Sequence, residues 1–531
     1  MTKYIALTAL LVAATSTQAQ QLPQQIQTLL SDPAAARAHW GIAVTTLTGT
    51  PIYSLNDAQL FQPASNAKLF TTAAAMALLT PDRTFETKVT GNFDPATGTI
   101  KGDLTLVGGG DANLDSNDVP YIAPSLRPKT PPPAPPPFRD LEDLAAKLVA
   151  KGVKSVTGNI IGDDTAFPYE PYPESWAADD IVWGYGAPIS ALTILDNQLR
   201  LTITPGKITG TPGHQTFPYA TVALEQFNVP YYTVQAQVET RPAKSPDGVQ
   251  VERLPGTRIL RVFGSIAEDA HPDVEQIAID DPAAFAALAF KQILAAHGIT
   301  VAGSANANHR IPRDGQGFLA KLHAHGGQED ITVAGGFGGG SCLTPFTPPT
   351  LATHHSATVI TDVTLTNKVS QNLHAELLLH QLGRVVFCGQ GSTVEGARMV
   401  RAFLLHAGIQ PDDFIFFDGS GLSAHDLVAP RATAKLLQYA TTQPWFPQWR
   451  ASLPIGGEDG SLASRFPKPP LKDHVFAKTG TLSEARALSG YLDCASGQTV
   501  IFSIMVNNHP PGSSADRETM DKIVAAIAAN N

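Results

Sequence analysis

A serine and a lysine lie three residues apart in the stretch PASNAKLF, residues 63–70. Residues three apart share one face of a helix, so Ser65 and Lys68 can approach each other if this stretch opens a helix. A serine hydroxyl needs an adjacent base to become a good nucleophile, and a lysine can be that base when burial lowers its pKa. Backbone N–H groups at a helix start also stabilise developing negative charge. The pair therefore indicates nucleophilic catalysis by serine, unless it is a chance match on the surface.

Two further triplets strengthen this interpretation. An S-x-N triplet at residues 370–372 opens an apolar helix pattern, and the chain's only K-[ST]-G, residues 478–480, lies on a predicted strand. S-x-N is a frequent triplet, and residues 54–56 and 304–306 match it too, but neither stands before a helix pattern. Each triplet alone could be a turn, a cap or a solvated lysine. Their order on helix, loop and strand is much less expected by accident.

The predicted elements place these patterns in one α/β domain whose halves lie far apart in the sequence. Residues 39–56 show β-favouring residues on both sides of a Thr-Gly-Thr turn, a hairpin pattern, and residues 67–80 are apolar nearly all round, which predicts a buried helix. Three strands and a terminal helix are predicted from residue 474 onward. We therefore expect a discontinuous domain of residues 20–85 and 350–531.

The region between these halves, residues 86–349, is predicted to be an insertion. It is rich in strand and turn patterns, and it contains a helix pattern that ends on Gly298. We expect two small domains in it, one nested at about residues 102–194. Within this part, residues 124–138 form a proline-rich segment, which predicts a stiff surface loop of polyproline type.

The N-terminus resembles a secretory signal. Residues 1–19 combine one lysine, an apolar run over residues 5–14 and small residues before Gln20, so we expect cleavage after Ala19 and an exported protein in the periplasm or medium. The run is shorter than the roughly 18 residues a spanning helix needs, and no other run is longer, so we expect no membrane anchor in the mature form. The formal net charge of −10 argues against a nucleic-acid partner.

Other site classes have weaker support. No G-x-S-x-G elbow occurs, which disfavours a Ser-His-Asp hydrolase. The glycine cluster at residues 335–340 lacks the third fingerprint glycine, and His323 and His325 lie in a glycine-rich loop without a metal motif. The acidic residues of 108–115 lack the spacing of a calcium loop. We expect no metal. The three cysteines, Cys342, Cys388 and Cys494, include no C-x-x-C pair and leave at least one thiol unpaired, so no disulfide is predicted from them.

The three catalytic patterns together resemble the active site of the penicillin-recognising serine enzymes, the D-alanyl-D-alanine peptidases and their β-lactamase relatives. The 305 residues from Ser65 to Ser370 resemble the D-alanyl-D-alanine carboxypeptidase/endopeptidase family, the class C low-molecular-mass penicillin-binding proteins, which carry a large insertion there. Residues 102–114, 418–430 and 453–466 are similar to that family as well. The resemblance implies a transpeptidase/β-lactamase-like domain, an antiparallel sheet flanked by helices, with a large, mainly β insertion.

The resemblance also implies roles for the first two motifs. Ser65 would attack the carbonyl of the D-Ala-D-Ala bond of a peptidoglycan stem peptide and form an acyl-enzyme. Lys68 would be the general base. Ser370 would relay a proton to the leaving amine, and Asn372 would hold the peptide amide of the substrate. β-Lactams would acylate the same serine and inhibit the enzyme, and no cofactor is implied.

The strand motif would bind the other end of the substrate. Lys478 and Thr479 would hold the terminal carboxylate of the substrate or the carboxylate of a β-lactam. Gly480 and Thr481, the next two residues of the same strand, would also line the substrate-binding site. The backbone N–H groups of Ser65 and Thr481 would form the oxyanion hole.

An acidic residue in the insertion completes the implied site. In that family a carboxylate shortly before an ISALT-like segment meets the free amino group of the stem residue, and here that position is Asp180. Trp176, Trp183 and Tyr185 lie near it in sequence, so partial desolvation would strengthen a charge-assisted hydrogen bond to an ammonium group. The alternative is that Asp179 and Asp180 are ordinary surface carboxylates on a turn.

Two other functions remain open at this level. A β-lactamase or esterase could use the same motifs, but a small-substrate hydrolase has no need of the long insertion. A peptidoglycan-binding scaffold with a degenerate site is disfavoured because all three motifs are intact.

Overall fold

The computed structural model describes residues 21–116, 119–133, 135–211, 214–312, 317–322, 348–386 and 390–531. Several sequence expectations concern residues outside these ranges: the signal at residues 1–19, Cys342, Cys388, His323, His325 and the glycine cluster at residues 335–340. Among the described residues, no helix combines the length and apolar character needed to cross a membrane.

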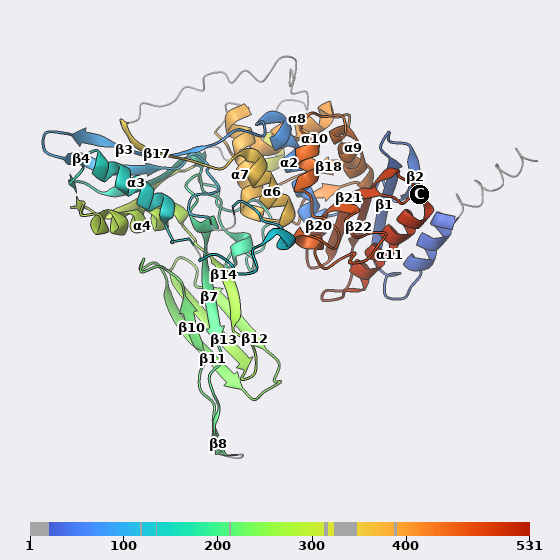
Figure 1. Ribbon diagram of the computed structural model, residues 1–531, viewed down its shortest axis with the longest axis horizontal. Helices are drawn as coiled ribbons and strands as arrows, with labels where there is room; N and C mark the ends of the chain where they lie inside the picture. Colours follow the sequence, from blue (N-terminus) through green and yellow to red (C-terminus); the bar gives the residue numbers. More distant parts are fainter. Residues whose placement is uncertain are drawn as a thin grey trace, which may run out of the picture.

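A five-stranded antiparallel sheet forms the centre of the α/β part, in the order β2-β1-β22-β21-β20. Both ends of the sequence build it, because β1 at the start pairs with β22 near the end (Figure 1). The predicted hairpin and the three predicted C-terminal strands are confirmed. Their bounds are β1 (His39–Thr46), β2 (Pro51–Leu55), β20 (Val475–Thr481), β21 (Ala485–Asp493) and β22 (Thr499–Asn507).

Helices cover both faces of this sheet, which explains why β21 and β22 are buried along nearly their whole length. Alternate side chains of β22 face opposite layers: Ile501 and Met505 pack with one helical group, Phe502 and Ile504 with the other. The first group comprises α2 (Ala67–Leu78), α6 (Val359–Lys368), α7 (Asn372–Gln381), α8 (Thr393–His406), α9 (Pro430–Ala440) and α10 (Phe446–Ser452).

The opposite face is covered by the helical residues 21–30 and by α11 (Ala515–Asn530). The apolar stripe of α11 is buried against the sheet together with Leu22 and Ile26. The expected packing of the terminal helix on the sheet is confirmed. Two short strands, β18 (Phe414–Ile415) and β19 (Leu427–Val428), pair near the helical face.

A second sheet, of seven strands, lies beside the α/β part. It contains both parallel and antiparallel strand pairs. The strand nearest the C-terminus, residues 350–355, pairs with the strand nearest the N-terminus. This sheet therefore continues past residue 349, where the predicted insertion ends. The domain limits stay a prediction. The strands are β3 (Glu86–Asp94), β4 (Thr99–Val107), β5 (Ser155–Val156), β6 (Ile160–Pro168), β15 (Thr300–Val301), β16 (Ala305–Arg310) and β17 (Thr350–His355).

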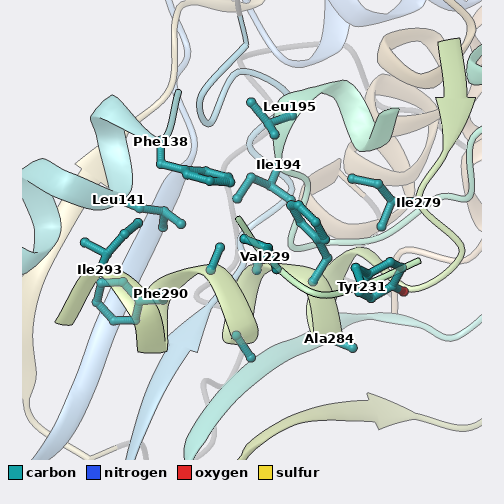
Figure 2. Close-up of a cluster of buried hydrophobic side chains, with 14 of the residues drawn as sticks. Phe138, Leu141, Ile194, Leu195, Val229, Tyr231, Ile279, Ala284, Phe290 and Ile293 are labelled. Carbon is teal, nitrogen blue, oxygen red and sulfur yellow. The ribbon is translucent and has the colours of Figure 1, made fainter. Parts of the chain in front are cut away.

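Two helices, α3 (Arg139–Ala150) and α4 (Pro282–Ala296), pack on this sheet. Asp281 caps α4 by accepting a hydrogen bond from the Ala284 N–H, and Gly298 follows it in the left-handed conformation, so the predicted helix end is confirmed. Figure 2 shows Phe138 and Leu141 from the start of α3 close to Phe290 and Ile293 of α4 in one buried cluster.

Two three-stranded sheets project from this part of the molecule (Figure 1). One has the order β10-β7-β14 and the other β11-β13-β12. The bounds are β7 (Gln198–Thr204), β10 (Thr221–Leu224), β11 (Thr233–Arg241), β12 (Gly248–Arg253), β13 (Ile259–Ala267) and β14 (Asp273–Ala278), with a small hairpin of β8 (Thr209–Thr211) and β9 (His214–Thr216) at the far end. The expected mainly β character of the insertion agrees with these sheets.

The proline-rich segment lies on the surface, as predicted. Its described residues from 124 to 137 are exposed, and the buried ring of Phe138 anchors its end in the core. Just before the segment, the Tyr121 hydroxyl accepts a hydrogen bond from the Gly460 N–H at 2.9 Å. Ser125 donates to the carboxylate of Glu458. The loop therefore lies against a turn close to the strand that carries the K-T-G triplet.

Candidate active site

Ser65 lies at the start of α2, on a single 3-10 turn formed by Ala64–Asn66. Its hydroxyl accepts a hydrogen bond from Lys68 Nζ at 2.9 Å. Ala64 holds a φ of 47°, in the left-handed region, and a side chain at Gly421 would meet the Ala64 carbonyl at 1.8 Å. This close approach of another backbone segment fixes the turn that presents Ser65.

Lys68 is fully buried and makes three hydrogen bonds. Besides Ser65, its Nζ donates to Asn372 Oδ1 at 2.6 Å and to the Ser420 carbonyl at 2.7 Å. Burial lowers the pKa of Lys68 to about 8, although nearby carboxylates act in the opposite direction. A lysine with this pKa has a sizeable neutral fraction near neutral pH and can accept a proton from the serine.

Two buried carboxylates shape the turn beneath Lys68. Glu376 accepts hydrogen bonds from the N–H groups of Gly419 and Ser420 at 2.9 and 2.8 Å. Asp418 accepts from the Gly421 N–H at 2.6 Å and from Trp176 Nε1 at 2.9 Å. Burial, with Asp418 nearby, raises the pKa of Glu376 to about 8. Together these bonds aim the Ser420 carbonyl at the lysine.

Neither carboxylate was predicted from the sequence to be part of the site. Residues 418–430 were noted only for their family-like pattern. The available signal was Glu376 itself, an ionisable residue inside the apolar pattern NLHAELLLHQ, because a buried carboxyl group requires hydrogen-bond partners.

The second motif forms a matching serine–lysine pair across the site. Lys478 Nζ donates to Ser370 Oγ at 2.9 Å and to the Thr479 carbonyl at 2.9 Å. Burial, together with the positive charge of Lys68, holds the pKa of Lys478 well below its usual value. Ser370 adopts a φ of 63°, so it also lies on a constrained turn.

Asn372 connects the catalytic pair to the insertion. Its Oδ1 accepts from Lys68, and its Nδ2 donates to the Tyr185 carbonyl at 2.8 Å. The other two S-x-N triplets lie elsewhere: Asn56 bonds the Trp40 carbonyl beside the central sheet, and Asn306 bonds its neighbour Ser304 at the edge of the second sheet. Of the three triplets, only residues 370–372 reach Lys68.

The K-T-G strand runs directly beside the nucleophile. A side chain on Gly480 would come within 2.6 Å of the Pro63 carbonyl and 3.1 Å of the Ser65 nitrogen, so glycine permits this approach. The Thr479 hydroxyl lies 2.7 Å from that of Ser461, a contact that no sequence pattern indicated.

An open cleft of about 690 Å³ exposes the site to solvent. Its lining brings together residues from the S-x-x-K and S-x-N motifs, the residue that follows K-T-G, and the insertion: Ser65, Ser370, Asn372, Thr481, Asp179, Asp180 and Tyr185. The structure therefore brings together, in one cleft, residues that the sequence predicted in four separate segments of the chain.

Comparison with known proteins places the chain in a family. The family model for D-Ala-D-Ala carboxypeptidase 3 (S13) matches residues 22–326 and 313–530. The chain belongs to this family. A D-alanyl-D-alanine carboxypeptidase of Actinomadura sp. is 32% identical over 524 residues, which cover 98% of this chain and 86% of that protein. The carboxypeptidase DacB of Haemophilus influenzae is 25% identical over 467 residues, with 87% and 83% covered.

The fold agrees with that of a solved relative. Penicillin-binding protein 4 of Haemophilus influenzae superposes with a TM-score of 0.74 and 22% identity, over 95% of this chain and 98% of that one. The expected family and fold class are thus confirmed. As a member of the D-Ala-D-Ala carboxypeptidase 3 family, the chain is a serine-type D-Ala-D-Ala carboxypeptidase.

In this carboxypeptidase Asp180 lies in the cleft and accepts a hydrogen bond from the Tyr185 hydroxyl at 2.9 Å. Partial burial raises the pKa of Asp180, against the effect of that bond. Of the other two aromatic residues, Trp176 donates to Asp418 and Trp183 lines a neighbouring cavity.

The acidic residues of 108–115, which lack the spacing of a calcium loop, have partners within the protein. Asp111 Oδ2 lies 3.3 Å from His354 Nε2, and Asn113 Nδ2 donates to Asp362 Oδ1 at 2.6 Å. Asp115 accepts from the Asp140 N–H at 2.6 Å. Within the described ranges, no group of three or more His, Cys, Asp or Glu side chains is arranged to hold a metal.

Proposed function

We propose that this carboxypeptidase acts on peptidoglycan stem peptides outside the cytoplasm through an acyl-enzyme on Ser65, and that β-lactams inhibit it by acylating the same hydroxyl. The observation that carries the proposal is the hydrogen bond between Ser65 and the fully buried Lys68. Export is proposed from the signal-like residues 1–19 and from the location of peptidoglycan.

In the proposed reaction, neutral Lys68 accepts the Ser65 proton while Oγ attacks the D-Ala carbonyl. The backbone N–H groups of Ser65 and Thr481 stabilise the oxyanion, and one such donor is worth about 10²–10³ in rate. Ser370 then passes a proton to the departing nitrogen as the C–N bond breaks. Water hydrolyses the ester and restores Ser65.

The carboxylate of the substrate would bind beside the second lysine. Lys478 is held between Ser370 and the Thr479 carbonyl, where burial disfavours its charge. The negative charge of a substrate carboxylate would raise the pKa of Lys478 again, because an opposite charge nearby favours the protonated lysine. The Thr479 hydroxyl, placed by Ser461, supplies a second donor. Asn372 can hold the substrate amide only if its Nδ2 exchanges the Tyr185 carbonyl for that of the substrate.

We further propose that the enzyme cleaves cross-linked stem peptides as an endopeptidase. The cleft, of about 690 Å³, is bordered by the insertion, which favours a large peptide as substrate. A β-lactamase would need no such space.

Penicillin turnover tests the acyl-enzyme proposal. Purified protein should gain the mass of one penicillin within minutes and lose it slowly, because the site is suited to a peptide leaving group, while it releases D-Ala from a pentapeptide. Time-resolved intact-protein mass spectrometry measures both steps. Rapid clearance of penicillin with many turnovers would instead identify a β-lactamase.

Asp180 should select substrates that carry a free side-chain amine. Its carboxylate is half-buried in the cleft next to Tyr185, where a charge-assisted hydrogen bond to an ammonium gains strength. We expect Asp180→Ala to lower kcat/KM about tenfold for a D-Ala-D-Ala peptide with a free amine, the effect of roughly 1.4 kcal/mol. Penicillin acylation offers no amine and should hardly change. Asp179→Ala is the matched control, and equal losses on peptide and penicillin would contradict the assignment.

A further inference from the structure

A second cavity, of about 540 Å³, adjoins the catalytic cleft. The two share Tyr185, Ser370 and Asn372, but Ser65 and Thr481 line only the cleft. The second cavity lies between the S-x-N turn, the start of β7 and residues 274–276 of β14. Its lining also includes Trp183, Gln198, Val274, Glu275, Gln276 and Val369.

Apolar side chains from three separate segments are left exposed around this cavity. Val274 of β14 is 50% exposed, Val369 at the end of α6 is 48% exposed, and Tyr185 is 50% exposed. Trp183 packs its ring partly on the insertion core. Scattered exposed apolar residues are ordinary, but several that line one concave surface beside a catalytic centre are typical of a ligand site.

The polar groups of the cavity suit a peptide. The amides of Gln198, Gln276 and Gln371 can donate to carbonyl groups and accept from N–H groups. Glu275 is partly buried, and within the described ranges no hydrogen bond or ion pair engages its carboxylate. A carboxylate in this state is available to accept hydrogen bonds from peptide N–H groups.

The position of the cavity relates it to the leaving group. Ser370, the residue proposed to protonate the departing nitrogen, faces both spaces, whereas the nucleophile and Asp180 face only the cleft. The acyl part of the substrate therefore belongs to the cleft, and the part attached to the departing nitrogen extends past Ser370.

We infer that this second cavity binds the peptide that departs when a cross-linked pair of stem peptides is cleaved. The inference rests on the proposed endopeptidase function. The amide bond between the D-Ala carbonyl and an amine of the second peptide breaks, the carbonyl bonds to Ser65 Oγ, and the amine takes the proton. In carboxypeptidase action the departing group is a single D-alanine, which is too small to occupy the cavity.

Filling the cavity should separate the two activities. We expect Val274→Trp to reduce kcat/KM for a cross-linked tetrapeptide dimer about tenfold, with release of D-Ala from a pentapeptide and penicillin labelling within twofold of wild type. Val149→Trp on α3, where the valine is 43% exposed and remote from the cavity lining, is the control. Glu275→Ala provides a second variant, with an expected threefold to tenfold loss on the dimer alone.

Binding to an inactive protein keeps the inference independent of catalysis. In the Ser65→Ala background, Val274→Trp should raise the dissociation constant for the dimer about tenfold and leave that for the pentapeptide unchanged, as measured by isothermal titration calorimetry. If both cavity variants cleave and bind the dimer like wild type, the inference is overturned even though the proposed endopeptidase stands. If the wild type never cleaves the dimer, the endopeptidase proposal fails, and the calorimetry alone decides whether the cavity holds the second peptide.

Discussion

Ser65→Ala should abolish covalent addition of penicillin and release of D-Ala, with a loss of at least about 10⁴-fold, because it removes the only atom proposed to bond to the carbonyl. The fold should persist. Lys68 keeps two of its hydrogen-bond acceptors, Asn372 Oδ1 and the Ser420 carbonyl, and no core side chain changes. Intact-protein mass spectrometry checks the adduct, and thermal unfolding checks the fold.

A serine variant in another S-x-N triplet is the matched control for Ser65→Ala. Ser304→Ala alters another S-x-N triplet, far from Lys68, and should label like wild type. Tryptic mapping of the wild-type adduct should locate it on the peptide containing Ser65. An adduct on any other residue, or labelling of a folded Ser65→Ala protein, would refute the nucleophile assignment.

Lys68→Ala should lower the acylation rate by roughly 10²–10⁴-fold, the usual effect of removing a general base. Ligand capture should fall much less, because Lys478 and Thr479 remain to hold the carboxylate. Stopped-flow acylation separates the rate from the dissociation constant. Lys101→Ala, on an exposed strand position, is the control, and near wild-type acylation by the Lys68 variant would exclude this lysine as the base.

The pH dependence of acylation tests independently whether Lys68 is the general base. Burial lowers the pKa of Lys68 to about 8, and the neutral form is the one that accepts a proton. The acylation rate should therefore rise about tenfold per pH unit below this value and level off above it. A base with an ordinary lysine pKa would still show a rising rate at pH 10.

The sequence by itself determined the family and the local elements. The spacing of Ser65 and Lys68, the K-T-G strand and the alternation of β22 follow from interactions between residues near in the chain, and these set helix starts, strands and turns directly. The family resemblance and the capped helix ending before Gly298 were likewise visible in residue patterns.

The helix pattern after residues 370–372 already favoured this S-x-N triplet, but only the tertiary structure decided how Lys68 is held. Asn372 lies 304 residues from Lys68 in the chain, yet their side chains bond at 2.6 Å. Glu376, buried under the Ser420 turn, and the Tyr185 carbonyl were missed for the same reason. Such contacts, and the pKa values that follow from burial, depend on how sheets and helices pack, and no local spacing encodes the distance between segments that packing brings together.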